Sequence, residues 1–222
     1  MDIMRAIRSK RPTCETIPGT DLPRVVLKTV GHEDIDTVHE WLSNQRVHCW
    51  LDFGGGRQQL SRLAVGSMLT SKRNRGLLFY APDSTVPIGI VCLTDIDNAM
   101  GSAEIWGVRG HFGPAPKNIT TSALLAAMAT GFLEHGREAI GTWLVDGNVA
   151  SVGVHAKLGM TQTGRQRGRH RMGAELRDRI LFDMLRHEFI ARFPDAPAAS
   201  GVTCRSLGWV DSAAACPRAE AE

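Results

Sequence analysis

The chain has 222 residues, of which 43% are hydrophobic and 22% are charged, and its formal net charge is +3. This length suits one compact domain with short extensions, and the composition is that of a globular protein with a substantial core. No run of about 18 apolar residues is present, and no apolar block follows the basic N-terminus, so the sequence indicates neither a transmembrane helix nor a secretory signal. We therefore expect a cytoplasmic protein without a membrane partner.

Five cysteines are present, an odd number, and no pair of them has the spacing of a metal or redox motif. Free thiols in a reducing compartment are the simplest interpretation. His32, His39 and His48 lie close in sequence, but no carboxylate or cysteine accompanies them at ligand spacing, so we expect no metal site. The cysteines are Cys14, Cys49, Cys92, Cys204 and Cys216.

The first half of the chain predicts a short strand, two helices and three more strands. A β-rich run covers 25–29, and apolar spacing predicts helices over 32–42 and 58–69. Extended runs at 76–81, 88–93 and 102–108 are separated by turn-forming segments, which indicates a three-stranded antiparallel meander.

The second half predicts alternating helices and strands. The clearest helix covers 119–135, and a strand at 140–145 leads to a helix at 149–158. Two further strands are expected at 160–167 and 179–185. We interpret 1–24 as an N-terminal extension, 25–193 as the domain and 194–222 as a flexible tail rich in Ala, Ser, Pro and Gly. Strands followed by strand–helix units predict a mixed α/β sheet.

This order of elements, together with three sequence segments, resembles the GNAT (Gcn5-related N-acetyltransferase) superfamily. The segment NVASVGVHAKLGM at 148–160 is similar to the family pattern N-x-x-S/A-x-x-x-Y-x-K-L-G-F/M. The segment from Gly164 to Phe189 and the hairpin from Pro87 to Val108 resemble the branch that acetylates the N-termini of ribosomal proteins. The resemblance implies a mostly antiparallel mixed sheet with splayed central parallel strands and flanking helices, and an N-acyltransferase activity that uses acetyl-CoA.

The resemblance also implies roles for four residues. Asn148 would fix the pantetheine arm of coenzyme A or cap the following helix. Ser151 and His155 lie four residues apart on one face of that helix, where family members assist the leaving thiolate and place a general acid. Glu104 occupies a strand position where similar enzymes carry a general base. Alternative interpretations are an exposed strand carboxylate paired with an arginine for Glu104, a surface histidine for His155 and a plain N-terminal hydroxyl for Ser151.

The loop that binds the CoA pyrophosphate in this superfamily, Q/R-x-x-G-x-G/A, departs from its pattern here. Ala115, Asn118 and Thr120 stand at the three anchor positions. Lys117 can supply a charge, Asn118 tolerates a left-handed backbone, and Thr120 and Thr121 can supply hydroxyls. The alternative is that Asn118 or Thr120 only caps the helix.

Three interpretations of the donor follow. Acetyl-CoA binds through the altered loop, or the donor is an aminoacyl-tRNA or a carrier-protein thioester, or the chain is a catalytically silent binding module. A cluster of Arg165, Arg167, Arg169 and Arg171 would suit the phosphates of an RNA or a carrier, although solvated strand positions also carry arginine.

We expect the acceptor to be an amine of a small molecule or a peptide N-terminus, attacked directly in a ternary complex. Glycines at 54–56 predict a mobile loop over the acceptor cleft. Trp41, Trp50 and Phe53 are candidates for its lining, with core packing as the alternative.

Overall fold

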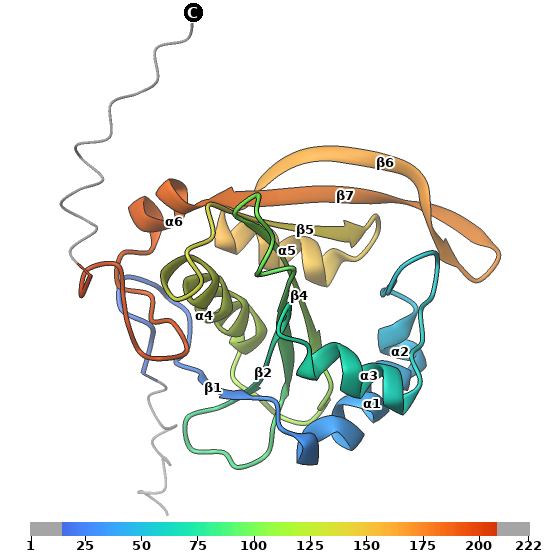
Figure 1. The fold of residues 1–222 in the computed structure, drawn as a ribbon, viewed down its shortest axis with the longest axis horizontal. Coiled ribbons are helices and arrows are strands. Elements are labelled where there is room, and N and C mark those ends of the chain that lie inside the picture. Colours follow the sequence, from blue (N-terminus) through green and yellow to red (C-terminus); the bar gives the residue numbers. More distant parts are fainter. Residues whose placement is uncertain (1–14, 208–222) are drawn as a thin grey trace, which may run out of the picture.

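The computed structural model describes residues 15–207 and has a seven-stranded sheet flanked by helices (Figure 1). Its strands are β1 (Val26–Thr29), β2 (Arg75–Tyr80), β3 (Gly89–Thr94), β4 (Ser102–Arg109), β5 (Ala139–Val145), β6 (Thr161–Met172) and β7 (Glu175–Leu185). Its helices are a 3-10 turn η1 (His32–Asp34), α1 (Ile35–Ser43), α2 (Gln45–His48), α3 (Arg62–Thr70), α4 (Ile119–Leu133), α5 (Val149–Leu158) and α6 (Arg186–Arg192).

The strands are arranged in the order β1-β2-β3-β4-β5-β7-β6, and every neighbouring pair is antiparallel except β4 and β5. These two central strands are parallel and pair over three positions only, from Ser102 opposite Ala139 to Glu104 opposite Gly141. Beyond that point both strands continue but their pairing ends. The expected mixed, mostly antiparallel sheet with splayed central parallel strands and flanking helices is confirmed.

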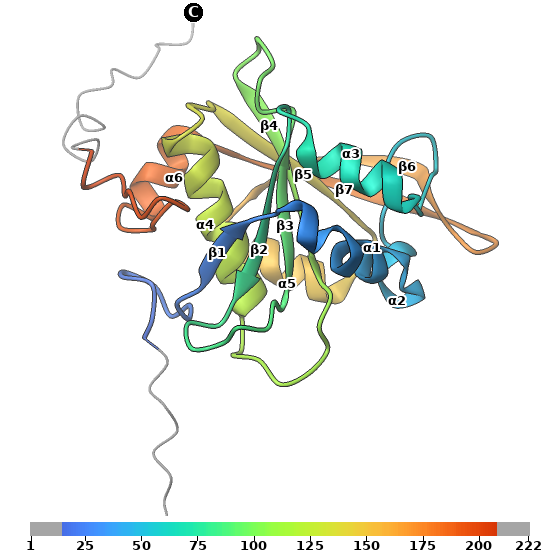
Figure 2. The same ribbon diagram turned by 60° about the horizontal axis from the view of Figure 1, so that its bottom comes forward.

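Two apolar layers cover the two faces of the sheet. On one face α4 packs against the sheet, and nearly all of its residues are buried because its sequence consists mainly of apolar residues with a few small hydroxyl side chains. On the other face α1, α2 and α3 pack on Leu78, Ile90 and Val108 (Figure 2). The strands alternate between these layers, so successive residues of β4 face opposite sides of the sheet.

The structure corrects several expected boundaries. The last two strands are much longer than expected and form a β6–β7 hairpin, in which Gly173 turns the chain with φ 62° and a bulge at Gly168 has φ 60°. Arginine-rich alternation carries little hydrophobic signal, which explains why the outer half of this hairpin was missed. The short helix α2 was also not expected.

Parts of both expected extensions pack on the core. Ile17 and Leu22 are buried before β1. The tail was expected to be flexible from residue 194, but Ala196, Ala198 and Cys204 are buried, because their small apolar side chains fit against α4 and α6. Cys14 and Cys216 lie outside the described residues. Among the helices of residues 15–207, none is long and apolar enough to cross a membrane.

Candidate active site

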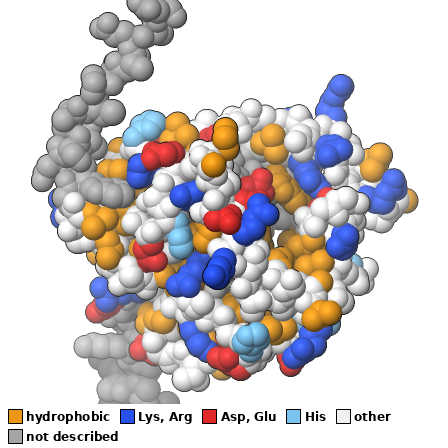
Figure 3. All heavy atoms as spheres, viewed as in Figure 1, with side chains coloured by type: hydrophobic (Ala, Val, Ile, Leu, Met, Phe, Trp, Pro, Cys, Tyr) orange, Lys and Arg blue, Asp and Glu red, His pale blue; other side chains and the backbone are white. Residues whose placement is uncertain are grey.

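A cleft of ≈ 830 Å³ opens where β4 and β5 separate. Its walls come from β4, β5, α3, the start of α5 and the segment that follows α2. This volume is typical of a site for a small molecule. In the space-filling view of Figure 3, hydrophobic side chains are exposed in a hollow of the surface, with acidic and basic side chains beside it.

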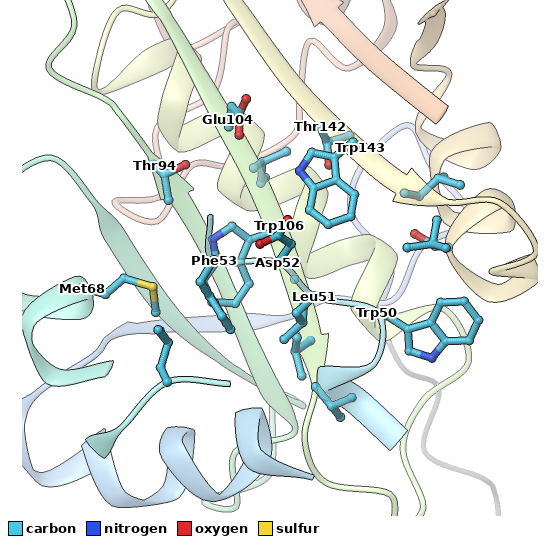
Figure 4. Close-up of a pocket in the computed structure, with 18 of the residues that line it drawn as sticks. Trp50, Leu51, Asp52, Phe53, Met68, Thr94, Glu104, Trp106, Thr142 and Trp143 are labelled. Atoms are coloured by element: carbon cyan, nitrogen blue, oxygen red, sulfur yellow. The ribbon is translucent and has the colours of Figure 1, made fainter. Parts of the chain in front are cut away.

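Glu104 lies at the point where the two strands part. It pairs with Gly141 at the last position of the parallel ladder, and its side chain points to the face covered by α1–α3 (Figure 4). Glu104 is exposed to solvent, and it lines the cleft, where neighbouring groups partly desolvate its carboxylate. This desolvation, and the nearby charge of Asp95, raise the pKa of Glu104, against the lowering effect of Arg179. No ion pair to Glu104 occurs within residues 15–207.

A buried ion pair fixes the wall of the cleft. Arg179 of β7 binds Asp52, and their side chains are only 12% and 10% exposed. The Arg179 guanidinium also lies 3.9 Å from the ring centroid of Trp143. Asp52 accepts hydrogen bonds from the backbone N–H groups of Gly54 (2.8 Å) and Gly56 (3.0 Å). Burial acts to raise the pKa of Asp52, but the hydrogen bonds from Arg179 and the glycines lower it overall.

The glycine loop is therefore anchored at its base. Phe53 follows Asp52, and its ring meets Trp106 edge-on at 6.2 Å. His170 of β6 reaches the same segment, since its Nε2 lies 2.7 Å from the carbonyl oxygen of Cys49. Gln58 donates to the carbonyl of Arg171 at 2.6 Å. The β6–β7 hairpin thus holds the loop over the cleft.

Helix α5 places three of the expected residues at the cleft. Asn148 is its N-cap and accepts a hydrogen bond from the backbone N–H of Ser151 at 3.2 Å. Asn148, Ser151 and His155 all line the cleft.

The His155 ring is buried and held in one orientation. Its Nδ1 lies 2.7 Å from the carbonyl oxygen of Ser151, and its ring packs on Phe182 at 5.3 Å. A carbonyl only accepts, so Nδ1 carries the proton and the neutral ring leaves Nε2 as an acceptor. Burial lowers the pKa of His155, although the bond to Ser151 acts in the opposite direction, so the neutral ring is favoured.

The start of α4 has an unusual N-cap. Asn118 takes a left-handed conformation (φ 65°) in place of the glycine of the family pattern. Its side chain does not cap the helix and instead accepts a hydrogen bond from Lys157 Nζ of α5 at 2.7 Å. The side-chain capping expected as the alternative is therefore wrong for Asn118.

The other candidates in this loop differ in exposure. Lys117 is exposed and Thr120 is partly exposed, whereas Thr121 is buried, with 2% of its surface exposed. The Thr121 side chain is turned into the protein, because the first turn of α4 already packs on the core. The sequence interpretation overlooked Lys157, whose ammonium group lies at the start of α4.

The four arginines of the cluster differ in whether they form ion pairs. Arg165 forms ion pairs with Asp146 and Asp178. Arg167, Arg169 and Arg171 are exposed on β6, an edge strand, and none of them forms an ion pair with a described residue.

Groups of three or more residues that could hold a metal ion do not occur between residues 15 and 207. Among the same residues, no cysteine lines the cleft. Burial raises the pKa of the Cys92 thiol to about 12, which makes it unreactive near neutral pH.

The model of the acetyltransferase (GNAT) domain family matches residues 24–161, which is more than half of the chain. The chain belongs to the GNAT acetyltransferase family. It is an acyltransferase enzyme, and the splayed central strands of the family fold form its cleft. Curated proteins give no significant match to its sequence.

Solved structures with the same fold share little sequence with this GNAT domain. A spermidine N-acetyltransferase from Vibrio cholerae, determined with CoA and spermine, has 14% identity and a TM-score of 0.65, covering 75% of this chain and 98% of its own. A GNAT-family acetyltransferase from Bacillus anthracis has 19% identity and a TM-score of 0.60, covering 74% of this chain and 96% of its own. These similarities show the fold.

Proposed function

We propose that the protein transfers an acyl group, by default acetyl from acetyl-CoA, to a primary amine of a small molecule, by direct attack in a ternary complex. The observation that carries this proposal is the end of the β4–β5 ladder at Glu104 and Gly141. From there both strands present unpaired backbone edges to a cleft of ≈ 830 Å³. Such edges can hydrogen-bond the amides of a pantetheine arm, and a β4 backbone N–H can stabilise the developing oxyanion.

The start of α4 provides the groups for the pyrophosphate. A left-handed Asn118 reproduces the backbone turn for which the family uses glycine. The amide of Ile119 donates to the carbonyl of Pro116, but that of Thr120 has no side-chain cap and is available to an anion. Lys157 and Lys117 add positive charge. An altered loop is thus compatible with a CoA donor.

Glu104 accepts the first proton in this proposal. An amine enters mostly as an ammonium ion, which has no lone pair for attack. The carboxylate of Glu104 removes one proton, directly or through a water molecule, and the neutral amine then attacks the thioester carbonyl. Its raised pKa brings the carboxylate closer in basicity to the group it must deprotonate.

His155 and Ser151 handle the second proton. The attacking nitrogen becomes positively charged and must lose a proton, while the departing CoA thiolate must gain one. The free Nε2 of neutral His155 takes the proton from nitrogen and passes it to sulfur, so the imidazolium acts as the acid expected from the sequence. The Ser151 hydroxyl donates a hydrogen bond to the thiolate. No covalent acyl-enzyme is formed.

A second candidate donor is an aminoacyl-tRNA or a carrier-protein thioester. The exposed Arg167, Arg169 and Arg171 favour it, because they have no carboxylate partner among the described residues. Binding to such a donor would weaken steeply with salt and depend on these arginines. A peptide N-terminus is the acceptor implied by the resemblance to the ribosomal-protein branch.

The test is isothermal titration of the full chain with acetyl-CoA and with free CoA, followed by product detection with a panel of amines. Micromolar binding that survives substitution of Arg167, Arg169 and Arg171 by alanine, with acetylated product, supports the proposal. Absence of binding at millimolar CoA overturns it and directs the assays to aminoacyl-tRNA and carrier donors. Binding of CoA without product from any amine would indicate a silent binding module.

A further inference from the structure

Five aromatic side chains line the cleft. The whole sequence contains 5 Trp, 7 Phe and 1 Tyr. The rings at the cleft keep part of their surface open, since four of them are only half-buried and Phe112 is 53% exposed. The aromatic lining residues are Trp50, Phe53, Trp106, Phe112 and Trp143.

Two of these rings lie next to the proposed base. Trp106 and Trp143 each stand two residues beyond the Glu104–Gly141 pair on the diverging strands, so they share the face to which Glu104 points. Figure 4 shows Glu104, Trp143 and Trp106 around the same opening, with Phe53 beside Trp106. An amine nitrogen held at Glu104 would place its substituent between these rings.

The rings are held in place by the protein. Arg179 stacks on one face of Trp143 at 3.9 Å and is itself bound to Asp52. Phe53 packs edge-on against Trp106 at 6.2 Å. Rings that are already oriented lose little entropy when a flat apolar group binds between them.

The carboxylates that line the cleft can bind only one ammonium group of an acceptor. Two of the three carboxylates are already paired, Asp52 with Arg179 and Asp95 with Arg73 (2.7 Å). Within residues 15–207, Glu104 is the one lining carboxylate without a cationic partner. The charged lining residues are Arg46, Asp52, Arg57, Arg73, Asp95, Glu104 and Arg109. A second ammonium group would therefore meet arginines or occupied carboxylates.

From this arrangement we propose that the acceptor is a primary monoamine that carries an aromatic ring on a short alkyl chain, and not a polyamine. The inference rests on the proposed function and refines it. Glu104 receives the ammonium group, and the ring lies against Trp106 and Trp143. Contacts between aromatic rings contribute beyond the area they bury, which gives this class an advantage over an alkylamine of the same chain length.

The test compares the kcat/KM values of 2-phenylethylamine, ethylamine and spermidine with acetyl-CoA as donor. We expect 2-phenylethylamine to exceed each of the others by about tenfold or more. Trp106→Leu should reduce this preference to a few-fold, whereas Trp106→Phe, which keeps a ring, should retain most of it. Leu63→Ala is the matched control, because Leu63 is 82% exposed on α3 and does not line the cleft.

Two further measurements separate the possible failures. Acetyl-CoA affinity, measured by titration, should be equal in all variants, and Phe53→Leu repeats the test if Trp106→Leu does not fold. A preference for spermidine or for ethylamine, or a preference that Trp106→Leu leaves unchanged, overturns the inference but leaves the acyltransferase proposal intact. Failure to bind acetyl-CoA and to acetylate any amine overturns both.

Discussion

Glu104 and Gly141 are the last residues paired across β4 and β5, and the absent side chain of Gly141 leaves space beside the Glu104 carboxylate. A Cβ atom at Gly141 would meet only the backbone oxygen of Phe182, at 3.8 Å, so the fold has room for a side chain there. Strand geometry also tolerates valine.

Filling this space should impair the reaction without unfolding the protein. We expect Gly141→Val to lower kcat/KM by roughly tenfold or more, because it displaces the amine from Glu104, and Gly141→Ala to lower it less. Steady-state kinetics and thermal unfolding of both variants provide the check. Equal kcat/KM in wild type and Gly141→Val would mean that the amine does not approach beside Gly141.

Glu104→Gln should separate activity from stability. Loss of a general base is expected to lower kcat by about 10²-fold or more. The folded-state pKa of Glu104 is raised, so its contribution to stability is present at low pH and is lost as the pH rises through that pKa. The ionised carboxylate therefore costs stability at pH 8, and Glu104→Gln should have a Tm at least equal to that of the wild type there.

Thermal unfolding at pH 8 and near pH 4 tests this sign, since the advantage of the glutamine should disappear in acid. In wild type, kcat/KM should fall toward acid with an apparent pKa above that of an ordinary glutamate. A Glu104→Gln variant that is less stable at pH 8, or fully active, contradicts the assignment.

The neutral ring of His155 is predicted to carry a proton during the reaction. Burial lowers its pKa, so the ring is neutral at pH 7 and its Nε2 can accept a proton. His155→Ala should lower kcat by about 10²-fold. His155→Gln keeps a polar side chain but cannot relay a proton, so it should be equally slow. If His155→Gln retains full turnover, His155 does not carry a proton. Measurement of kcat against pH, with NMR titration of the ring, gives the relevant pKa.

Asn118 allows the backbone and side-chain effects at the donor loop to be separated. Its φ of 65° is easy for glycine and strained for alanine. We expect Asn118→Ala to cost about 1 kcal/mol of stability and to weaken acetyl-CoA binding several-fold, because the loop would shift. Asn118→Gly keeps the turn and loses only the bond to Lys157. Titration with acetyl-CoA and thermal unfolding distinguish the two variants. If both variants bind acetyl-CoA as tightly as the wild type, this loop is not part of the donor site.

The Asp52–Arg179 pair should stabilise the wall of the cleft. Asp52→Ala leaves the Arg179 guanidinium buried and unpaired and frees the amides of Gly54 and Gly56, which should cost about 2–4 kcal/mol. Asp36→Ala, which breaks the exposed pair with Arg62, is the matched control and should leave the Tm within error. Urea unfolding of the two variants compares them directly. A similar small effect in both would show that the buried pair does not hold the loop.

The strands and helices could be predicted because they carry clear periodic patterns, and their order, with the segment at 148–160, resembles the GNAT family and so implied its fold. Helix α4 has a local signal in its apolar stripe, and the segment from Asn148 to Leu158 has one in its capping residue and the glycine that follows it. The outer part of the β6–β7 hairpin was missed because arginine-rich strands lack such a pattern. The packing of Ala196 and Cys204 was missed because small side chains become core residues only when a surface is present to receive them.

By itself, the sequence determined the alternation of strands and helices and placed Ser151 and His155 on one face of a helix, because such residues take their orientation from local geometry. Its resemblance to the GNAT family implied the fold and the positions of Glu104, Ser151 and His155 at the cleft, which all three line. Tertiary structure alone decided the partners of these residues. The contact between Lys157 and Asn118 joins two helices, and the stack of Arg179 on Trp143 joins two strands and a loop. Such contacts between distant segments leave no local pattern in a single sequence, because they depend on how the chain folds back on itself.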